Sequence, residues 1–305
     1  MNSASIKSDL LLLFAAIIWG FSFVAQRVGM EHIGPYAFNG LRFLMGSVSL
    51  IPLMMWQRKK SVESGEVQVA KTKKTILIGG CITGLVLFSG ASFQQVGLIY
   101  TSAGKAGFIT GLYVVFVPLL WLLLGKKSSR GTWIGATIIL IGLYPLSVTE
   151  ELSISYGDTL EIAGAFCWAV YVIVVGLYSH RMNPITFSFF IFLSCAILSL
   201  LTSLIIETPT IEAVLEVGWP LVFSGVGSVG VAYTLQVIAQ KNTHPAHAAI
   251  ILSLETVFAA LGGWLFLNEA LSNQEIIGCT IMLFGILISQ YFTSCKEISE
   301  NKCIA

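Results

Sequence analysis

The sequence predicts an all-α integral membrane protein whose ten transmembrane helices form two inverted repeats of five. Its composition, its ten apolar windows and an internal duplication predict this class. Of the 305 residues, 55% are hydrophobic and only 11% are charged. A soluble protein carries roughly 25% charged residues, so most of this surface is expected to face a lipid bilayer. The formal net charge of +1 gives no basic field for nucleic acid, and we expect no such partner.

Apolar windows of about 20 residues, the length needed to cross a ~30 Å hydrocarbon core, occur ten times. The breaks between them carry helix-ending dipeptides such as Gly34-Pro35 and Asn183-Pro184. The first window follows Lys7 as in a signal peptide, but it is long enough to span, and we expect an uncleaved first helix. The predicted spans are residues 8–28, 35–56, 76–98, 105–124, 131–148, 159–179, 184–206, 218–239, 246–267 and 275–293.

The charges are sorted by loop. With the N-terminus in the cytoplasm, 14 of the 17 Lys and Arg residues fall on the cytoplasmic side, for example in Arg58–Lys60 and Lys71–Lys74. The outer loops hold mostly acids, such as Glu150, Glu151 and Glu207. The positive-inside rule therefore predicts that both termini are cytoplasmic. We expect a multi-pass protein of a bacterial inner membrane.

The sequence repeats itself. Ala15–Ser22 aligns with Gly164–Tyr171 at an offset of 149 residues, and Gln95–Gly107 aligns with Gln236–Ala248 at an offset of 141. Because each copy holds five helices, the second copy enters the membrane from the opposite side. Such inverted repeats are typical of secondary transporters. We predict a first five-helix repeat over 1–148, a second over 149–295 and a cytoplasmic tail over 296–305.

Three segments resemble one known family. They are "IIWGFSFVAQRVG" in the first span, "YTSAGKAGFITGLYVVFVPLLWLLLGKK" in the fourth, and "AAIILSLETVFAALGGWLFLNEALSNQEIIGCTIMLFGI" in the last two. In this order they resemble the EamA-type, ten-helix branch of the drug/metabolite transporter superfamily, and the resemblance covers essentially the whole chain. It implies export or exchange of small metabolites, often amino acids, through a central cavity. It implies no particular substrate and no cofactor.

The residues that would bind a substrate are sought near the bilayer midplane, between the two halves. Trp19, Tyr113, Trp168 and Glu255 lie near the middle of their spans, and the two tryptophans are repeat partners. A buried indole usually needs a hydrogen-bond acceptor, which a cavity would supply. We therefore predict that these residues line the cavity. The alternative is that both rings only fill space beside small residues.

Glutamine and tyrosine residues extend this predicted site. Gln95 and Gln236 are repeat partners and candidate gate residues, although interhelical hydrogen bonding explains them equally well. Gln94, Tyr171 and Tyr233 lie on neighbouring turns and are predicted to line the same path.

The acid in the ninth span has two interpretations. Glu255 stands alone in the apolar run "IILSLETVFAALGGWLF", and its repeat partner by alignment is Val114. The first interpretation is functional: Glu255 faces the cavity, where it contacts substrate or carries a coupling proton, so protons are a candidate coupling ion. The second is structural and pairs it with Arg42. Lys105 is expected to extend its ammonium group to the outer interface.

Other classes of function are less well supported by the sequence. It contains no H-E-x-x-H and no G-x-S-x-G motif, and its four histidines are too scattered for a metal site. We therefore expect no enzyme, no catalytic residues, no metal and no cofactor. An uncoupled facilitator or channel for small solutes is the main alternative to a transporter, and counterflow would distinguish them.

Overall fold

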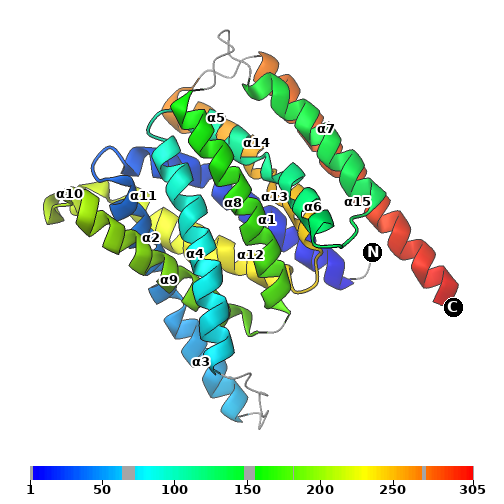
Figure 1. Cartoon of the computed structure of the whole chain (residues 1–305), viewed down its shortest axis with the longest axis horizontal. Coiled ribbons are helices and arrows are strands. Elements are labelled where there is room, and N and C mark those ends of the chain that lie inside the picture. The colour runs from blue at the N-terminus through cyan, green and yellow to red at the C-terminus, as the bar shows by residue number, and fades with distance from the viewer. Residues whose placement is uncertain (1–2, 64–72, 148–154, 181, 270–272, 305) are drawn as a thin grey trace.

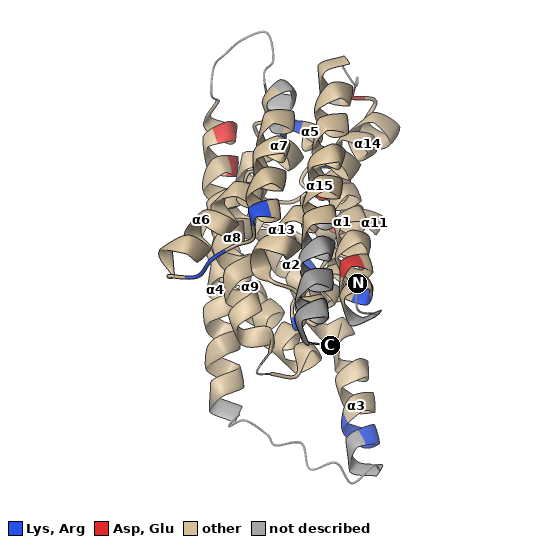
Figure 2. Cartoon of the chain, turned by 90° about the vertical axis from the view of Figure 1, so that its right-hand side faces the viewer, with Lys and Arg blue, Asp and Glu red and all other residues tan. Residues whose placement is uncertain are grey.

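The computed structural model describes residues 3–63, 73–147, 155–180, 182–269 and 273–304. Lys71, Glu150 and Glu151, which support the predicted orientation, lie outside the described residues. The described chain is a bundle of helices without strands (Figure 1). Figure 2 shows Lys and Arg residues at the end of α3 (Ile51–Glu63), a segment predicted to be cytoplasmic.

The first repeat supplies five spans, two of which are divided. These are α1 (Ser3–Gly29), α2 with α3 (Pro35–Ser49 and Ile51–Glu63), α4 (Lys73–Gly97), α5 with α6 (Ala103–Thr110 and Tyr113–Leu123) and α7 (Arg130–Ser147).

The second repeat supplies five more. These are α8 (Tyr156–Ser179), α9 (Pro184–Ile206), α11 with η1 and α12 (Trp219–Val222, Phe223–Tyr233 and Thr234–Ala239), α13 with α14 (Pro245–Leu252 and Glu255–Leu267) and α15 (Asn273–Ile304). A short helix, α10 (Ile211–Val217), precedes α11. Eight of the described segments are long and apolar enough to cross a membrane, and two shorter apolar segments, Arg130–Gly142 and Ile276–Ser289, complete the ten. The predicted all-α membrane fold is confirmed. α15 continues through most of the predicted tail, to Ile304.

Caps fix where several spans begin. The Asn183 side chain accepts hydrogen bonds from the backbone N–H groups of Ile185 and Thr186, directly before a proline that cannot donate one. Ser155 and Asp158 form a reciprocal capping box at the start of α8. Carboxylates from the second repeat also cap two helices of the first. Glu207 accepts from the N–H groups of Tyr36 and Ala37 at 2.9 and 2.7 Å.

The packing has the symmetry of the repeat. α2 packs on α9, and α7 packs on α15, so in both pairs a helix meets its own counterpart. Figure 1 shows α7 and α15 side by side at one edge of the bundle. α1 packs on α13 and α14, as α8 packs on α5 and α6. Exchanging the repeats therefore maps these contacts onto one another.

The fourth and ninth spans are each interrupted at the same place in the repeat. Near the break, Leu112 N–H donates to the Ile109 carbonyl and Leu254 N–H donates to the Ile251 carbonyl, both three residues back. Such tight 3₁₀ turns within a helix often mark functional hinges. The helical halves restart at Tyr113 and Glu255, which are 142 residues apart. The structural partner of Glu255 is therefore Tyr113, and the predicted partner Val114 is wrong by one residue, because the offset between the repeats shifts within this span.

The eighth span differs from its counterpart, the third span, in one respect. The segment η1 is a π-helix of 11 residues, whereas α4, at the equivalent place in the first repeat, is α-helical. π-helical turns are rare and frequent at functional sites. The end of η1 brings Tyr233 into the centre of the molecule.

Candidate functional site

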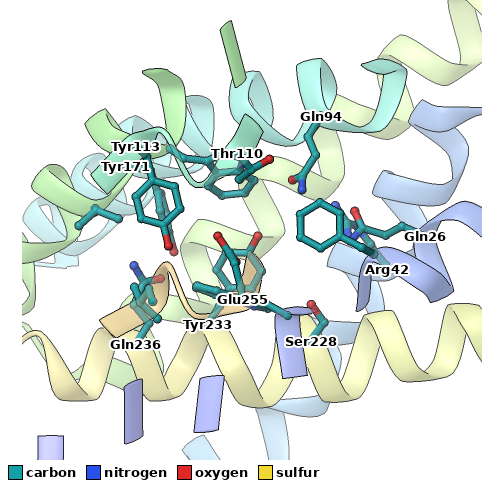
Figure 3. Close-up of a pocket in the computed structure, with 15 residues that line it drawn as sticks. Gln26, Arg42, Gln94, Thr110, Tyr113, Tyr171, Ser228, Tyr233, Gln236 and Glu255 are labelled. Atoms are coloured by element: carbon teal, nitrogen blue, oxygen red, sulfur yellow. The ribbon is translucent and has the colours of Figure 1, made fainter. Parts of the chain in front are cut away.

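A central cavity lies between the two repeats (Figure 3). Its volume is about 30 Å³, and helices of both halves contribute to its wall. The lining residues are Trp19, Phe23, Gln26, Arg42, Gln94, Thr110, Tyr113, Trp168, Tyr171, Val172, Ser228, Tyr233, Gln236, Leu252 and Glu255.

The cavity brings together eight of the nine predicted site residues, and their role in binding stays a prediction. The ninth, Gln95, is fully buried outside the lining, and neither polar atom of its amide has a hydrogen-bond partner among the described residues. Sequence reasoning missed Gln26, Arg42, Thr110 and Ser228. Gln26 is seven residues after Trp19, the spacing of one helix face, so its position was available from the sequence.

Aromatic rings form the middle of the cavity wall, with Tyr233 at their centre. The Trp19 ring lies 4.5 Å from the Tyr233 ring between centroids, and the Trp168 and Tyr171 rings lie 6.1 and 5.9 Å from it. Tilted and edge-on pairs at these distances are favourable arrangements of aromatic rings. The repeat-related tryptophans therefore meet on one tyrosine, each from its own half.

Glu255 is the acid of this site. It is the first residue of α14, directly after the 3₁₀ turn, and only 5% of its surface is exposed. The Tyr113 hydroxyl points toward its carboxyl group from the equivalent position of the first repeat (Figure 3). The two helix breaks thus present an acid and a phenol to the same cavity.

Arg42 is the cation of this site, and it is 1% exposed. Its guanidinium carbon lies 4.9 Å from the centroid of the Phe43 ring and 5.8 Å from that of Phe38. Among the described residues no carboxylate lies within 4 Å of it, so the predicted ion pair with Glu255 is absent from this conformation. The two helices that carry these residues, α2 and α14, are not among the closely packed helix pairs of the described chain.

The energies indicate why this arginine calls for an explanation. A charged side chain at the centre of a membrane helix costs about 2.5–3.5 kcal/mol on insertion scales. A cation–π contact returns roughly 0.5–2 kcal/mol, and the second ring, at 5.8 Å, lies near the limit of that interaction. The rings therefore offset only part of the cost.

Several polar atoms of the lining have no hydrogen-bond partner within the described protein. They belong to Trp19, Gln26, Arg42, Tyr113, Trp168, Tyr171 and Gln236. Buried polar groups are normally hydrogen-bonded, and exceptions call for a physical reason. A polar solute in the cavity would supply these partners.

A second buried acid lies close to this cavity. Glu161, on α8, is fully buried and accepts a hydrogen bond of 3.3 Å from the hydroxyl of Thr110. Glu161 does not line the cavity, whereas Thr110 does. An acid within an apolar span was the sequence signal that singled out Glu255, and the same signal applies to Glu161.

Two polar pairs join the halves beyond the ends of the cavity. Lys105 Nζ lies 2.9 Å from a carboxylate oxygen of Asp158, and His247 Nε2 lies 3.2 Å from one of Asp9. The aspartates are 149 residues apart and the basic residues 142, which are the offsets of their helices in the repeat. The pairs are therefore repeat-related. Asp158 holds the ammonium group of Lys105 at the start of α8, and the expected extension of Lys105 to the outer interface stays a prediction.

The described residues contain no group of three His, Cys, Asp or Glu side chains placed to hold a metal ion. The fold and the cavity together define a helical membrane protein with a polar chamber between two inverted halves.

Comparison with known proteins gives the family. The family model of EamA-like transporters matches residues 6–148 and again residues 155–291, so the chain belongs to the EamA-like transporter family and is a multi-pass membrane transporter. The two matches correspond to the two repeats.

Individual relatives agree with this assignment. An uncharacterized transporter of Archaeoglobus fulgidus is 30% identical, with 92% of this chain and 85% of that protein covered. YoaV of Bacillus subtilis, also described as an uncharacterized transporter, is 24% identical over 96% of this chain and its own full length. The uncharacterized inner membrane transporter YedA of Escherichia coli K12 is 24% identical over 92% of this chain and 91% of its own. A solved structure with 20% identity has a TM-score of 0.73 and covers 95% of this chain and 98% of its own, which shows the same fold.

Proposed function

We propose that this protein is a secondary transporter that exports or exchanges small metabolites, amino acids or related compounds, by alternating access to the central cavity. It acts in a bacterial inner membrane with both termini in the cytoplasm. The observation that carries the proposal is a polar cavity between inverted repeats, with a repeat-related polar pair beyond each end. Inverted repeats allow one scaffold to open to either side by exchanging the conformations of its halves.

The size of the cavity supports a moving carrier. A volume of about 30 Å³ holds roughly two or three water molecules, at ~10–15 Å³ each on the same measure. A metabolite needs more room than this. The halves must therefore separate on one side to admit a substrate and on the other side to release it.

The two polar pairs fit the role of latches in this cycle, meaning contacts that hold the two halves together on one side of the membrane. The Lys105–Asp158 pair joins α5 to α8, and the Asp9–His247 pair joins α1 to α13. Each pair links one repeat to the other, so separating the halves on one side breaks the pair of that side. Lys105 and Asp158 lie on the predicted outer side, and Asp9 and His247 lie on the predicted inner side.

A channel is the alternative, and the polar pairs formed on both sides of the cavity argue against it. A channel conducts through a path that is open to both sides at once, whereas in this structure both pairs are formed around a small chamber. The helix breaks at Gly111–Leu112 and Ser253–Leu254 supply hinges at equivalent places, as two alternating states require.

Counterflow tests the proposal. The purified full chain is reconstituted into vesicles that are preloaded with the common amino acids or left empty, and uptake of the same labelled compounds is measured. A carrier accumulates label transiently in the preloaded vesicles and faster than in the empty ones. A channel gives the same approach to equilibrium in both, and this result would reject alternating access. Absence of uptake for every compound would reject the substrate class.

Reporter fusions test the orientation. A fusion after Lys60 and a fusion after Glu151 are expected to report opposite sides, the first cytoplasmic. The same side for both would overturn the topology.

A further inference from the structure

We propose that Arg42, with Gln94, forms an anion subsite at one end of the cavity, and that it binds the carboxylate group of the transported solute. This inference rests on the proposed function and narrows its substrate class.

The first support is the state of Arg42. Its guanidinium lines the cavity, is almost fully buried, and has no carboxylate within ion-pair distance among the described residues. An arginine is always charged in proteins. The guanidinium lies over the rings of Phe38 and Phe43, which offer no hydrogen-bond acceptor oxygens. The planar guanidinium presents paired donors that match a carboxylate.

The second support is the set of polar side chains that lie near Arg42. Figure 3 shows Gln26 and Gln94 beside Arg42 at one end of the cavity, and Tyr113, Tyr171 and Gln236 toward the other. The Gln94 side chain carries amide donors that are able to bind an anion, and it is buried, at 5% exposure. The Gln26 amide nitrogen already donates to the backbone carbonyl and hydroxyl of Ser22, so Gln26 contributes polar surface rather than a free donor. The end of the cavity near Arg42 therefore offers donors from Arg42 and Gln94.

The third support is the placement of charge on the two halves. Arg42 comes from the first repeat, and the residue 149 positions later is Ile191. Glu255 comes from the second repeat, and its structural partner is the neutral Tyr113. The cavity thus has one cation and one acid, each added to a single half and unpaired with the other. A solute with a carboxylate and an amine matches both groups at once.

Arg27 provides the contrast with a structural arginine. Its guanidinium donates to the backbone carbonyls of Leu98 and Ile99, which ties the end of α1 to the turn after α4. For Arg42 no such backbone contact is found in the described chain. Arg27 is therefore a matched control outside the cavity.

The test compares three panels of compounds by their effect on the thermal unfolding of the full chain in detergent. The panels are the common amino acids, the C-terminal amides of the same amino acids, and the matching carboxylic acids without the amine. We expect stabilisation by members of the first panel, with an affinity at least tenfold weaker for the corresponding amides. Arg42→Gln should weaken binding at least tenfold, Arg42→Lys should weaken it less, and Arg27→Gln should leave it unchanged.

Three results would overturn the subsite: amides that bind as tightly as the acids, an Arg42→Gln variant within twofold of wild type, or no stabilisation by any carboxylate. If Arg42→Gln does not fold, the amide panel on the wild type and Arg42→Lys still decide. The outcome is separable from that of the proposed function. Counterflow of a solute without an anionic group would preserve transport and reject the subsite, whereas carboxylates that bind without exchange would do the reverse.

Discussion

Replacing Arg42 with methionine is expected to stabilise the fold. The charge costs about 2.5–3.5 kcal/mol at the centre of a membrane helix, and the two ring contacts return about 1–2 kcal/mol in total. Methionine removes the charge, keeps an unbranched stem of similar reach, and makes its own favourable contacts with aromatic rings. The net gain should be about 0.5–2.5 kcal/mol. At roughly 2–4 °C per kcal/mol for chains somewhat shorter than this one, the unfolding temperature should rise by about 1–10 °C.

Thermal unfolding of the purified chain in detergent measures this shift. Arg27→Met is the control, and it should lower the unfolding temperature, because Arg27 holds two backbone carbonyls that would lose their donor. A lower unfolding temperature for Arg42→Met would refute the reasoning. It would mean that Arg42 supports the structure through contacts stronger than the cost of its burial.

Three further predictions concern the site and its supports. Trp19→Ala or Trp168→Ala should weaken solute binding about tenfold, with folded yield near that of wild type; lost yield with unchanged affinity would favour a packing role. Gly20→Ala should lower the free energy of unfolding, measured by chemical denaturation, by roughly 1–3 kcal/mol, because the added Cβ would lie 2.2 Å from the Cβ of Phe258. Glu255→Gln should impair exchange or alter its pH dependence in counterflow; wild-type affinity and pH dependence would show that Glu255 is not functional.

Gly227→Ala is the control for the glycine prediction. The nearest atom to a Cβ at Gly227 is 3.5 Å away, an ordinary contact. Its stability should therefore stay within about 0.5 kcal/mol of wild type. Helix propensity favours alanine over glycine at both positions, so equal losses would mean that the close contact of α1 with α14 does not set the cost.

The spans could be predicted from the sequence because hydropathy over about 20 residues directly reflects the lipid environment. The predicted span 184–206 coincides with α9, and 246–267 differs from the combined α13 and α14 by one residue. The site residues near the midplane followed from the same count. Gln95 was the exception, because neighbouring residues of a helix face different directions and only Gln94 lines the cavity.

Other features could not be read from the sequence. The break at Ser253–Leu254 contains neither glycine nor proline, so no local sequence pattern predicted an interruption of the helix there. The 11-residue π-helix η1 was not predicted from the sequence either. The two polar pairs were not predicted because the equivalent positions hold different residues, Lys105 and His247. That both are basic groups bound to an aspartate is seen only in the structure. The separation of Arg42 from Glu255 likewise depends on which helices are neighbours.

Access to the cavity from each side tests the central claim most directly. A Ser228→Cys substitution in a background without the six native cysteines places one thiol in the cavity lining. Its reaction with a membrane-impermeant maleimide is measured in vesicles of both orientations. Two variants break the equivalent latches, Lys105→Met on the predicted outer side and His247→Met on the predicted inner side. Alternating access predicts that the first increases labelling from outside and decreases it from inside, and that the second does the opposite. A change in the same direction on both sides, or no change from either variant, would contradict the account.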